Sequence, residues 1–405
     1  MKSGITLTIL TLIILRFRQI VGITATTSTE RIAVAGYGSE IHNITTPDGY
    51  VVSLFRLKNS TQGPTASSSA PVVLLMHGLL CSSDLWILKG LKSHLAYDLM
   101  DKGYDVWLGN CRGNTYGQNH VSLTASDRLF WRFSWHEIAL NDLPSTIDYI
   151  LKETGQASLH YVGHSQGCTI LFVLLSMRPE YNQKLRTAHM LAPVAYMKNV
   201  RSLLFNALKL FLGNYSPLSA LIGDTALLQQ PILQYMFGIY QCRRQQLPLE
   251  TCASIYYFIF GGRSAYFRDS ALQDAYDSSP APASSHQIIH YLQLIASGYF
   301  RQYDYGPEGN MQQYNQSSPP EYKVANIKTR FPLHLYYSDY DELSTKTDVE
   351  KFSRILGGHK TVSHFIPLKN FAHIDFIWAY NVGEVINEPI LKIMNEAEEI
   401  LKREP

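Results

Sequence analysis

The stretch from Leu159 to Met177 reads LHYVGHSQGCTILFVLLSM, in which the polar turn Gly163–Gly167 separates two apolar runs. The first run has the length and composition of a buried strand, and the second those of a buried helix that ends before Pro179. Glycines at both ends of the turn allow a sharp change from strand to helix, which would leave the middle residue, Ser165, strained and exposed. An ordinary turn between two buried elements can have the same pattern, so the rest of the chain has to decide.

Strand-like and helix-like segments alternate along the chain. The continuous apolar run PVVLLMHG, at 71–78, is typical of a central parallel strand, and the segment at 50–57 alternates like an edge strand. We expect further strands at 104–110, 159–162, 187–193, 332–338 and 361–367, and helices at 93–103, 135–154 and 389–402. Pro144 should interrupt the helical segment at 135–154. This alternation predicts an α/β fold in which a mostly parallel sheet has helices on both faces.

The character of the sequence changes between residues 196 and 320. Aromatic-rich helical stretches such as SLLFNALKLFLG and SIYYFIF are joined by segments rich in glycine, proline and glutamine, and no strand is evident. We interpret this cap segment (residues 196–320) as a helical cap and lid, inserted between a first part of the core (23–195) and a second part (321–405). Solvated helices that only decorated the surface would not carry so many apolar residues, because these would cost solubility.

The first residues have the features of a secretion signal. Lys2 precedes an apolar run from Ile5 to Leu15, which is too short to cross a bilayer core of about 30 Å. We therefore predict a cleaved signal peptide over residues 1–22 and no transmembrane segment after cleavage. Cleavage removes three of the 35 basic residues, which leaves 32 against 33 acidic ones and changes the net charge from +2 to −1. This balance argues against nucleic acid as a partner.

Four N-x-S/T sequons agree with passage through a secretory route. They lie at Asn43, Asn59, Asn214 and Asn315, and they predict N-glycosylation at these positions. We therefore expect a secreted protein of an extracellular fluid or a gut lumen, with the lysosome as the alternative destination.

The chain has five cysteines, too few for a disulfide scaffold. Cys242 and Cys252 bracket a short polar loop, and we expect these two to pair in an oxidising compartment. Cys81, Cys111 and Cys168 lie among apolar residues, where a buried thiol is typical. The sequence has neither an H-E-x-x-H motif nor a paired C-x-x-C arrangement, so we expect no metal and no cofactor.

Candidates for a catalytic triad follow the strands that carry them. A serine hydroxyl is a weak nucleophile, which needs a histidine base within reach and a carboxylate to orient that base. The loop after the predicted strand at 332–338 carries Asp339, Asp341 and Glu342, and the loop after the strand at 361–367 carries His373. Ser165, Asp341 and His373 are therefore our candidates, although spacing alone does not separate Asp341 from Asp339 or Glu342.

A developing oxyanion needs two backbone N–H donors. Gln166, directly after the candidate nucleophile, supplies one of them. The loop Met76–Leu80 directly follows a buried strand, and we assign its Leu79 as the second donor. His77 and His164 belong to the same two turns, and we expect them to act as packing or hydrogen-bonding residues.

Several long motifs together carry a family resemblance. In chain order they are MHGLLCSSD, WLGNCRGNTYGQNH, FWRFSWHEIALNDLP, YVGHSQGCT, LAPVAYMKN and NFAHIDFIW. In order and spacing they resemble the acidic lipases, the animal family of gastric and lysosomal acid lipases, over nearly the whole mature chain. The resemblance implies an α/β-hydrolase core with a helical cap and a movable lid.

The same resemblance implies roles for single residues. The family's Asp-x-Leu pattern matches Asp341–Leu343 and so favours Asp341 over Asp339 as the acid of the triad. The family's oxyanion donors match Leu79 and Gln166. Its cap disulfide matches Cys242 and Cys252. The chain departs from the family at Ser338–Tyr340, where a glycine pair and a lysine are usual. We therefore expect the second carboxylate there, Asp339, to disfavour ionisation of the catalytic acid.

The implied activity is hydrolysis of triacylglycerol or cholesteryl ester through an acyl-enzyme, at an oil–water or membrane interface where the apolar lid opens. Two alternatives remain. One is a hydrolase of soluble short-chain esters, which an interface would not activate. The other is a secreted, catalytically inactive lipid-binding or carrier protein, against which the intact set of Ser165, Asp341 and His373 argues.

Overall fold

The protein was analysed as a computed structural model, which describes residues 26–59, 70–88, 94–227 and 231–403. The expected signal peptide, residues 1–22, lies outside these ranges. Among the described helices, none combines the length and the apolar character needed to span a membrane.

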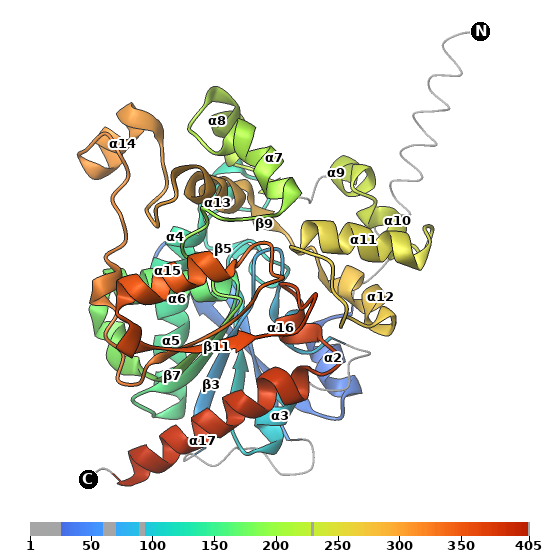
Figure 1. Ribbon diagram of the computed structural model, residues 1–405, viewed down its shortest axis with the longest axis vertical. Coiled ribbons are helices and arrows are strands. Elements are labelled where there is room, and N and C mark those ends of the chain that lie inside the picture. Colours follow the sequence, from blue (N-terminus) through green and yellow to red (C-terminus); the bar gives the residue numbers. More distant parts are fainter. Residues whose placement is uncertain (1–25, 60–69, 89–93, 228–230, 404–405) are drawn as a thin grey trace.

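A mixed, mostly parallel sheet forms the centre of the molecule (Figure 1). Six neighbouring strands, namely β4, β3, β6, β7, β10 and β11, are parallel to one another, whereas β1 and β2 run antiparallel to their neighbours. Two-residue β5 (Asn119–His120) pairs with β2. The order across the sheet is β1 (Gly38–Thr45), β2 (Tyr50–Lys58), β4 (Asp105–Leu108), β3 (Val72–Met76), β6 (Leu159–His164), β7 (Leu185–Leu191), β10 (Leu333–Ser338) and β11 (Thr361–Ile366).

The central strand β3 shows why the sheet needs helices on both faces. Val72, Leu74 and Met76 belong to one hydrophobic cluster, and the alternate residues Val73 and Leu75 belong to the other. Because side chains alternate along a strand, a strand that is apolar at every position has to be covered on both sides.

Helices from different parts of the chain supply this cover (Figure 1). One cluster contains side chains from α5 (Leu143–Thr154), α6 (Gln166–Met177) and α15 (Lys346–Leu356). The other contains side chains from α3 (Leu95–Asp101) and α17 (Glu388–Arg403). The predicted α/β fold with helices on both faces is thereby confirmed.

Two sequence predictions about single elements need correction. The segment at 50–57 is not an edge strand, because β2 lies between β1 and β4 and leaves the edge to β1. Ile44 is the one residue of β1 that is buried, so this strand lacks the apolar alternation that would have predicted it. The helical segment at 135–154 is interrupted before Pro144 and not at it: a π-helical turn (Ile138–Asp142) separates α4 (Trp135–Glu137) from α5, and Pro144 lies in the first turn of α5.

The cap segment lies between β7 and β10 in the chain, and Figure 1 shows its helices together above the sheet. It contains one short strand pair, β8 (Ala226–Leu227) with β9 (Ala283–Ser284), which the sequence did not indicate. A disulfide joins Cys242 to Cys252. The helices are α7 (Leu203–Leu212), α8 (Pro217–Gly223), α9 (Pro231–Met236), α10 (Ile239–Arg243), α11 (Leu249–Ile259), α12 (Asp269–Ser278), α13 (Ser285–Ser297) and α14 (Gly306–Tyr314).

The positions of the sequons and of the unpaired cysteines fit the sequence analysis. The sequon asparagines Asn43, Asn59, Asn214 and Asn315 are all exposed, as an attached glycan requires. Glycosylation itself remains a prediction. The three remaining cysteines are free and buried, as expected from their apolar surroundings.

Candidate active site

Ser165 occupies a strained turn between β6 and α6. Its φ of 52° and ψ of −110° lie outside the regions that residues other than glycine ordinarily adopt. The two flanking glycines are required by close packing of the backbone. A Cβ at Gly163 would lie 2.7 Å from the carbonyl carbon of Gly167, and a Cβ at Gly167 would lie 2.4 Å from the carbonyl oxygen of Met76. The turn therefore has the geometry of a nucleophile elbow, in which the serine projects from the end of the strand.

A buried histidine and a buried aspartate meet beside this turn. His373 lies in the loop after β11, and its Nδ1 is 2.7 Å from Oδ2 of Asp341, in the loop after β10. A carboxylate can only accept, so Nδ1 carries the proton and Nε2 is left as a base. The other oxygen of Asp341 accepts hydrogen bonds of 2.8 Å from the backbone N–H groups of Leu343 and Ser344. The carboxylate is thus held in one orientation.

The structure separates the acids that spacing left open. Asp341 is fully buried and bonds to His373. The side chain of Asp339 is 53% exposed, and its carboxylate lies 3.5 Å from Nζ of Lys346. Asp339 therefore points to solvent beside a cation, and its expected effect on the ionisation of Asp341 stays a prediction.

A further carboxyl group, that of Asp375, is buried near Asp341. Asp375 begins α16 (Asp375–Trp378), where its side chain accepts hydrogen bonds from the N–H of Ala372 (2.6 Å) and the hydroxyl of Ser264 (2.5 Å). Burial raises the pKa of Asp375 to about 7, and the negative charge of Asp341 contributes to the rise. Asp375 had no predicted role, and its one signal in the sequence was its position two residues after His373.

The two assigned oxyanion donors belong to segments that meet at Ser165. Leu79 lies in the loop after β3, which packs so closely that a Cβ at Gly78 would be 3.2 Å from Cβ of Ser165. Gln166 is the first residue of α6, and its side-chain Nε2 donates to Oε1 of Gln287 at 2.7 Å. The side chain of Gln166 is thus directed into the cap segment, while its backbone N–H begins the helix beside the serine.

Two buried histidines, His164 and His77, form hydrogen bonds that link loops around the site. Nε2 of His164 donates to the carbonyl oxygen of His373 at 3.0 Å, and Nδ2 of Asn114 donates to Nε2 of His77 at 3.1 Å. Burial lowers the pKa of His164 to about 3 and that of His77 to about 4, so both are neutral at physiological pH. They have the hydrogen-bonding roles that the sequence predicted.

An apolar pocket lies at the candidate catalytic residues. Ser165, His373 and Leu79 all line it. Its other walls come from the core and from the cap segment, and they are almost entirely apolar: Leu80, Leu85, Val194, Phe205, Ile259, Phe260 and Trp378. Walls of this composition favour an apolar substituent next to the polar groups.

Comparisons with known proteins agree with this architecture. Residues 28–90 match the profile of a partial alpha/beta-hydrolase lipase region, and residues 71–220 match that of the alpha/beta hydrolase fold. A crystal structure of a membrane phospholipase A superposes with a TM-score of 0.52 over 98% of this chain and 99% of that one. At 14% sequence identity this superposition shows a shared fold only.

Whole-length relatives are more informative. Lipase 3 of Drosophila melanogaster is 37% identical over 91% of this chain and 93% of its own length. The gastric triacylglycerol lipases of Bos taurus and Homo sapiens are 36% and 34% identical, each over 91% of this chain and 90% of its own length. This chain therefore belongs to the α/β-hydrolase lipase family that includes the gastric triacylglycerol lipases.

Proposed function

We propose that this lipase hydrolyses the ester bonds of neutral lipids, with Ser165 as nucleophile, His373 as general base and acid, and Asp341 as the carboxylate that orients the histidine. The observation that carries the proposal is the buried bond between His373 and Asp341 at a pocket that Ser165 also lines, in a chain of this family. The N–H groups of Leu79 and Gln166 are the proposed oxyanion donors.

The chemistry proceeds in two halves. Nε2 of His373 takes the proton of the Ser165 hydroxyl while Oγ attacks the ester carbonyl carbon, and the carbonyl oxygen becomes an oxyanion held by the two N–H groups. The carbon–oxygen bond to the alcohol then breaks, and His373 gives its proton to the departing alcohol. In the second half a water molecule attacks the acyl-enzyme by the same proton transfers, which releases a fatty acid and restores Ser165.

The apolar walls of the pocket support a long-chain substrate. Burial of a hydrocarbon chain is favourable by about 0.8 kcal/mol per methylene, so a pocket of this kind selects fatty acyl esters over small polar ones. The printed names of the bovine and human relatives support triacylglycerol as the substrate. Cholesteryl ester is the second neutral lipid that the experiment below includes.

The cap segment, residues 196–320, supports action at a lipid surface. On α7 and α8, side chains that are large and apolar are exposed to water: Leu203 (77%), Leu210 (76%), Phe211 (65%), Leu218 (46%) and Leu221 (65%). A second exposed set lies on and around α9 and α11: Tyr235, Met236, Phe237, Leu249 and Phe258. Apolar patches of this kind mark a surface that another apolar phase covers. We assign these helices as the cap and lid that contact the lipid.

The proposed location is outside the cytosol, in a secreted or a lysosomal compartment. A predicted signal peptide, exposed sequons and a disulfide between Cys242 and Cys252 support this assignment. N-glycosylation at the four sequon asparagines belongs to the same proposal.

The test is fatty-acid release from emulsified triolein and cholesteryl oleate, with p-nitrophenyl butyrate as a soluble substrate. The parent protein is compared with Ser165→Ala and with Ser318→Ala, a matched change at an exposed serine. We expect the first variant to lose activity by a factor on the order of 10⁶ and the second to keep it. Turnover of the soluble ester alone would support the short-chain alternative, and lipid binding without any turnover in the parent would support a carrier.

A further inference from the structure

The segment that carries the proposed Leu79 donor is held by residues far away in the chain. We call Gly78–Trp86 the oxyanion segment; it includes the 3₁₀ helix η1 (Ser83–Trp86). Near its end, the Asp84 carboxylate is buried and accepts hydrogen bonds from the hydroxyls of Ser28 (2.6 Å), Tyr116 (3.1 Å) and Ser82 (3.1 Å). Such a set of donors keeps a buried carboxylate in one place.

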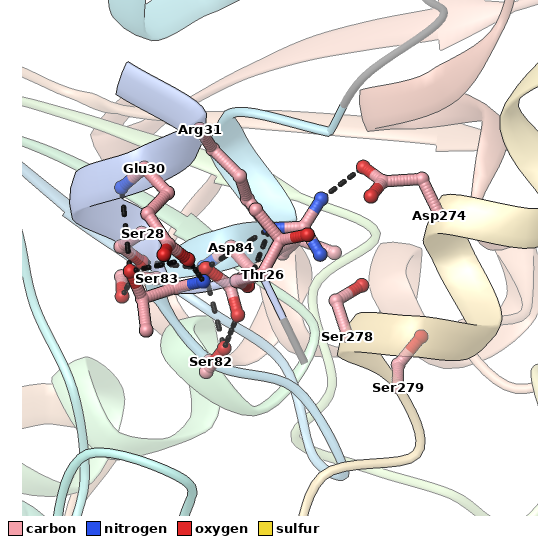
Figure 2. A network of polar contacts seen from close by, with 12 residues as sticks. Thr26, Ser28, Glu30, Arg31, Ser82, Ser83, Asp84, Asp274, Ser278 and Ser279 are labelled. Carbon is pink, nitrogen blue, oxygen red and sulfur yellow. Dashed lines mark hydrogen bonds and ion pairs between the residues drawn. The ribbon is translucent and has the colours of Figure 1, made fainter. Parts of the chain in front are cut away.

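Ser28 belongs to the N-terminal helix α2 (Ser28–Val34), which also supplies a buried cation (Figure 2). The side chain of Arg31 is fully buried, and its Nε lies 3.5 Å from Oδ1 of Asp84. Nη1 of Arg31 forms an ion pair with Asp274 on α12 of the cap segment. One guanidinium group therefore connects the oxyanion segment with the cap.

The cap segment makes a second contact with the oxyanion segment, at Leu80, the residue after the proposed donor Leu79. The N–H of Ala281, just after α12, donates to the carbonyl oxygen of Leu80 at 2.6 Å. Asp274 and Ala281 thus fix α12 and its following turn between Arg31 and Leu80. A shift of Asp274 would displace the same piece of chain that holds the carbonyl oxygen of Leu80, the residue after Leu79.

The backbone at this point is strained. Leu80 has a φ of 60°, which is rare for a residue that is neither glycine nor asparagine and persists only where the surroundings impose it. Relaxation of Leu80 to negative φ would turn the two peptide planes that adjoin Leu80, and the first of these directly follows Leu79. The contacts that hold both ends of the oxyanion segment are therefore the contacts that keep the donor in place.

We propose that Arg31 is a positioning residue for ester hydrolysis: by bridging Asp84 and Asp274 it holds the Leu79 donor and the cap in register. The inference rests on the proposed function, because it takes Leu79 as an oxyanion donor. Complete loss of one oxyanion donor lowers kcat by about 10²–10³-fold. A displaced donor should cost less than this, so we expect a fall in kcat of roughly 10-fold to 100-fold when the bridge is removed.

The experiment compares Arg31→Met with Arg56→Met. Arg56 forms an ion pair with Asp105, which starts β4 and so lies at the end of the sheet opposite to the active site. Both substitutions remove a guanidinium from a carboxylate, with a side chain that is fully buried at Arg31 and 12% exposed at Arg56, so Arg56→Met controls for the loss of an ion pair. We measure kcat and KM with p-nitrophenyl acetate, a substrate too small to depend on the acyl pocket, at a temperature where every variant is folded.

The proposal expects Arg31→Met to lower kcat with KM nearly unchanged, because an oxyanion donor acts on the transition state, and Arg56→Met to keep kcat. Should Arg31→Met not fold, Arg31→Lys retains the cation but cannot bridge both carboxylates, and its kcat is expected to fall as well. In the double variant with Asp84→Asn, kcat should fall no further than in Arg31→Met alone.

Three results would overturn the inference: equal kcat in the Arg31 and Arg56 variants, a change confined to KM, or additive losses in the double variant. These failures differ from failure of the proposed function. An inactive parent, or a parent unaffected by Ser165→Ala, overturns the proposed function and the inference with it. An active, Ser165-dependent parent with unaffected Arg31 variants overturns the inference alone.

Discussion

Polar side chains are buried at the sheet edge, by which we mean the carboxyl ends of the strands around Ser165, whereas apolar side chains are exposed on the outer surface of the cap segment. At the sheet edge, Asp341 is fully buried and each of its oxygens accepts a hydrogen bond. On the cap surface, Leu203 and Leu210 are 77% and 76% exposed. Buried polar groups need fixed partners, whereas apolar groups in water gain free energy when another apolar phase covers them.

This contrast separates two contributions to lipase activity. The polar groups at the sheet edge are buried and hydrogen-bonded, so we expect this region to determine how fast a bound ester reacts. The cap surface exposes large apolar side chains, so we expect it to determine how strongly the enzyme adsorbs to lipid. Substitutions at the edge should therefore change kcat on every substrate, and substitutions on the cap surface should change activity on emulsions only.

The largest effect is expected from loss of the base. In His373→Ala, kcat should fall on the order of 10⁶-fold on emulsified and on soluble esters alike, since no group remains to take the proton of Ser165. Asp341→Asn should cost about 10⁴-fold, because the amide no longer holds the right tautomer of His373. Initial rates measured by titration check both values. His359→Ala, at an exposed histidine, is the control, and a comparable loss there would refute the assignment.

The second effect concerns the packing of the elbow. Gly167→Ala would force its Cβ to within 2.4 Å of the carbonyl oxygen of Met76, so we expect the free energy of unfolding to fall by about 3 kcal/mol. The control is Gly358→Ala, whose Cβ would meet no heavy atom within 4 Å. Urea unfolding curves of both variants measure the difference. Equal stability of the two would mean that the backbone approach at the elbow is not tight.

The third effect is acid sensitivity of the core, which the cap surface should not share. Neighbouring strands carry the buried or half-buried histidines His160, His189, His334 and His364. Burial, with the charge of His364 contributing, lowers the pKa of His334 to about 4. A histidine whose folded pKa is lowered gives its full stability above the unfolded pKa of about 6.5, and this stability is lost as the pH falls towards the folded pKa.

For His334 the linkage amounts to about 2 kcal/mol of stability lost between pH 7 and pH 5. His334→Gln cannot titrate, so its unfolding free energy should depend less on pH than that of the parent by this amount. Urea unfolding at the two pH values measures it. The exposed His359→Gln should keep the slope of the parent, and an unchanged slope in His334→Gln would show that this histidine is not the source.

The smallest effect is expected on the cap surface. The double substitution Leu210→Ser and Phe211→Ser removes two exposed apolar groups, so hydrolysis of emulsified triolein should fall about 10-fold through weaker adsorption. Hydrolysis of p-nitrophenyl butyrate and the midpoint of thermal unfolding should not change. Ile400→Ser, on α17 at the other side of the sheet, is the control. Equal losses on both substrates would remove the distinction between edge and cap.

The sequence predicted the parts of the molecule whose signal is local. Leu159–Met177 has strand, turn and helix in one continuous stretch, and the apolar run at β3 marks a strand covered on both faces. β1 carries no comparable signal, because seven of its eight residues are exposed or half-buried. It becomes a strand through its pairing with β2.

Contacts between distant residues could not be predicted in the same way. Arg31 and Asp274 are 243 positions apart, and neither the periodicity nor the charge pattern of the sequence relates them. The environment of Asp375 could not be predicted either, since its raised pKa arises from burial beside Asp341 rather than from its own sequence neighbours. Such roles follow from packing, which one sequence does not specify position by position.

The central claim is that Ser165, at the buried sheet edge, carries the chemistry. A p-nitrophenyl alkylphosphonate tests it most directly, because attack by the active serine forms a stable phosphonyl ester and releases one p-nitrophenolate per active site. Digestion and mass spectrometry then locate the label. We predict one label per chain, on the peptide that contains Ser165, with loss of hydrolysis in proportion to labelling. A label on another residue, or full activity after labelling of Ser165, would contradict the account.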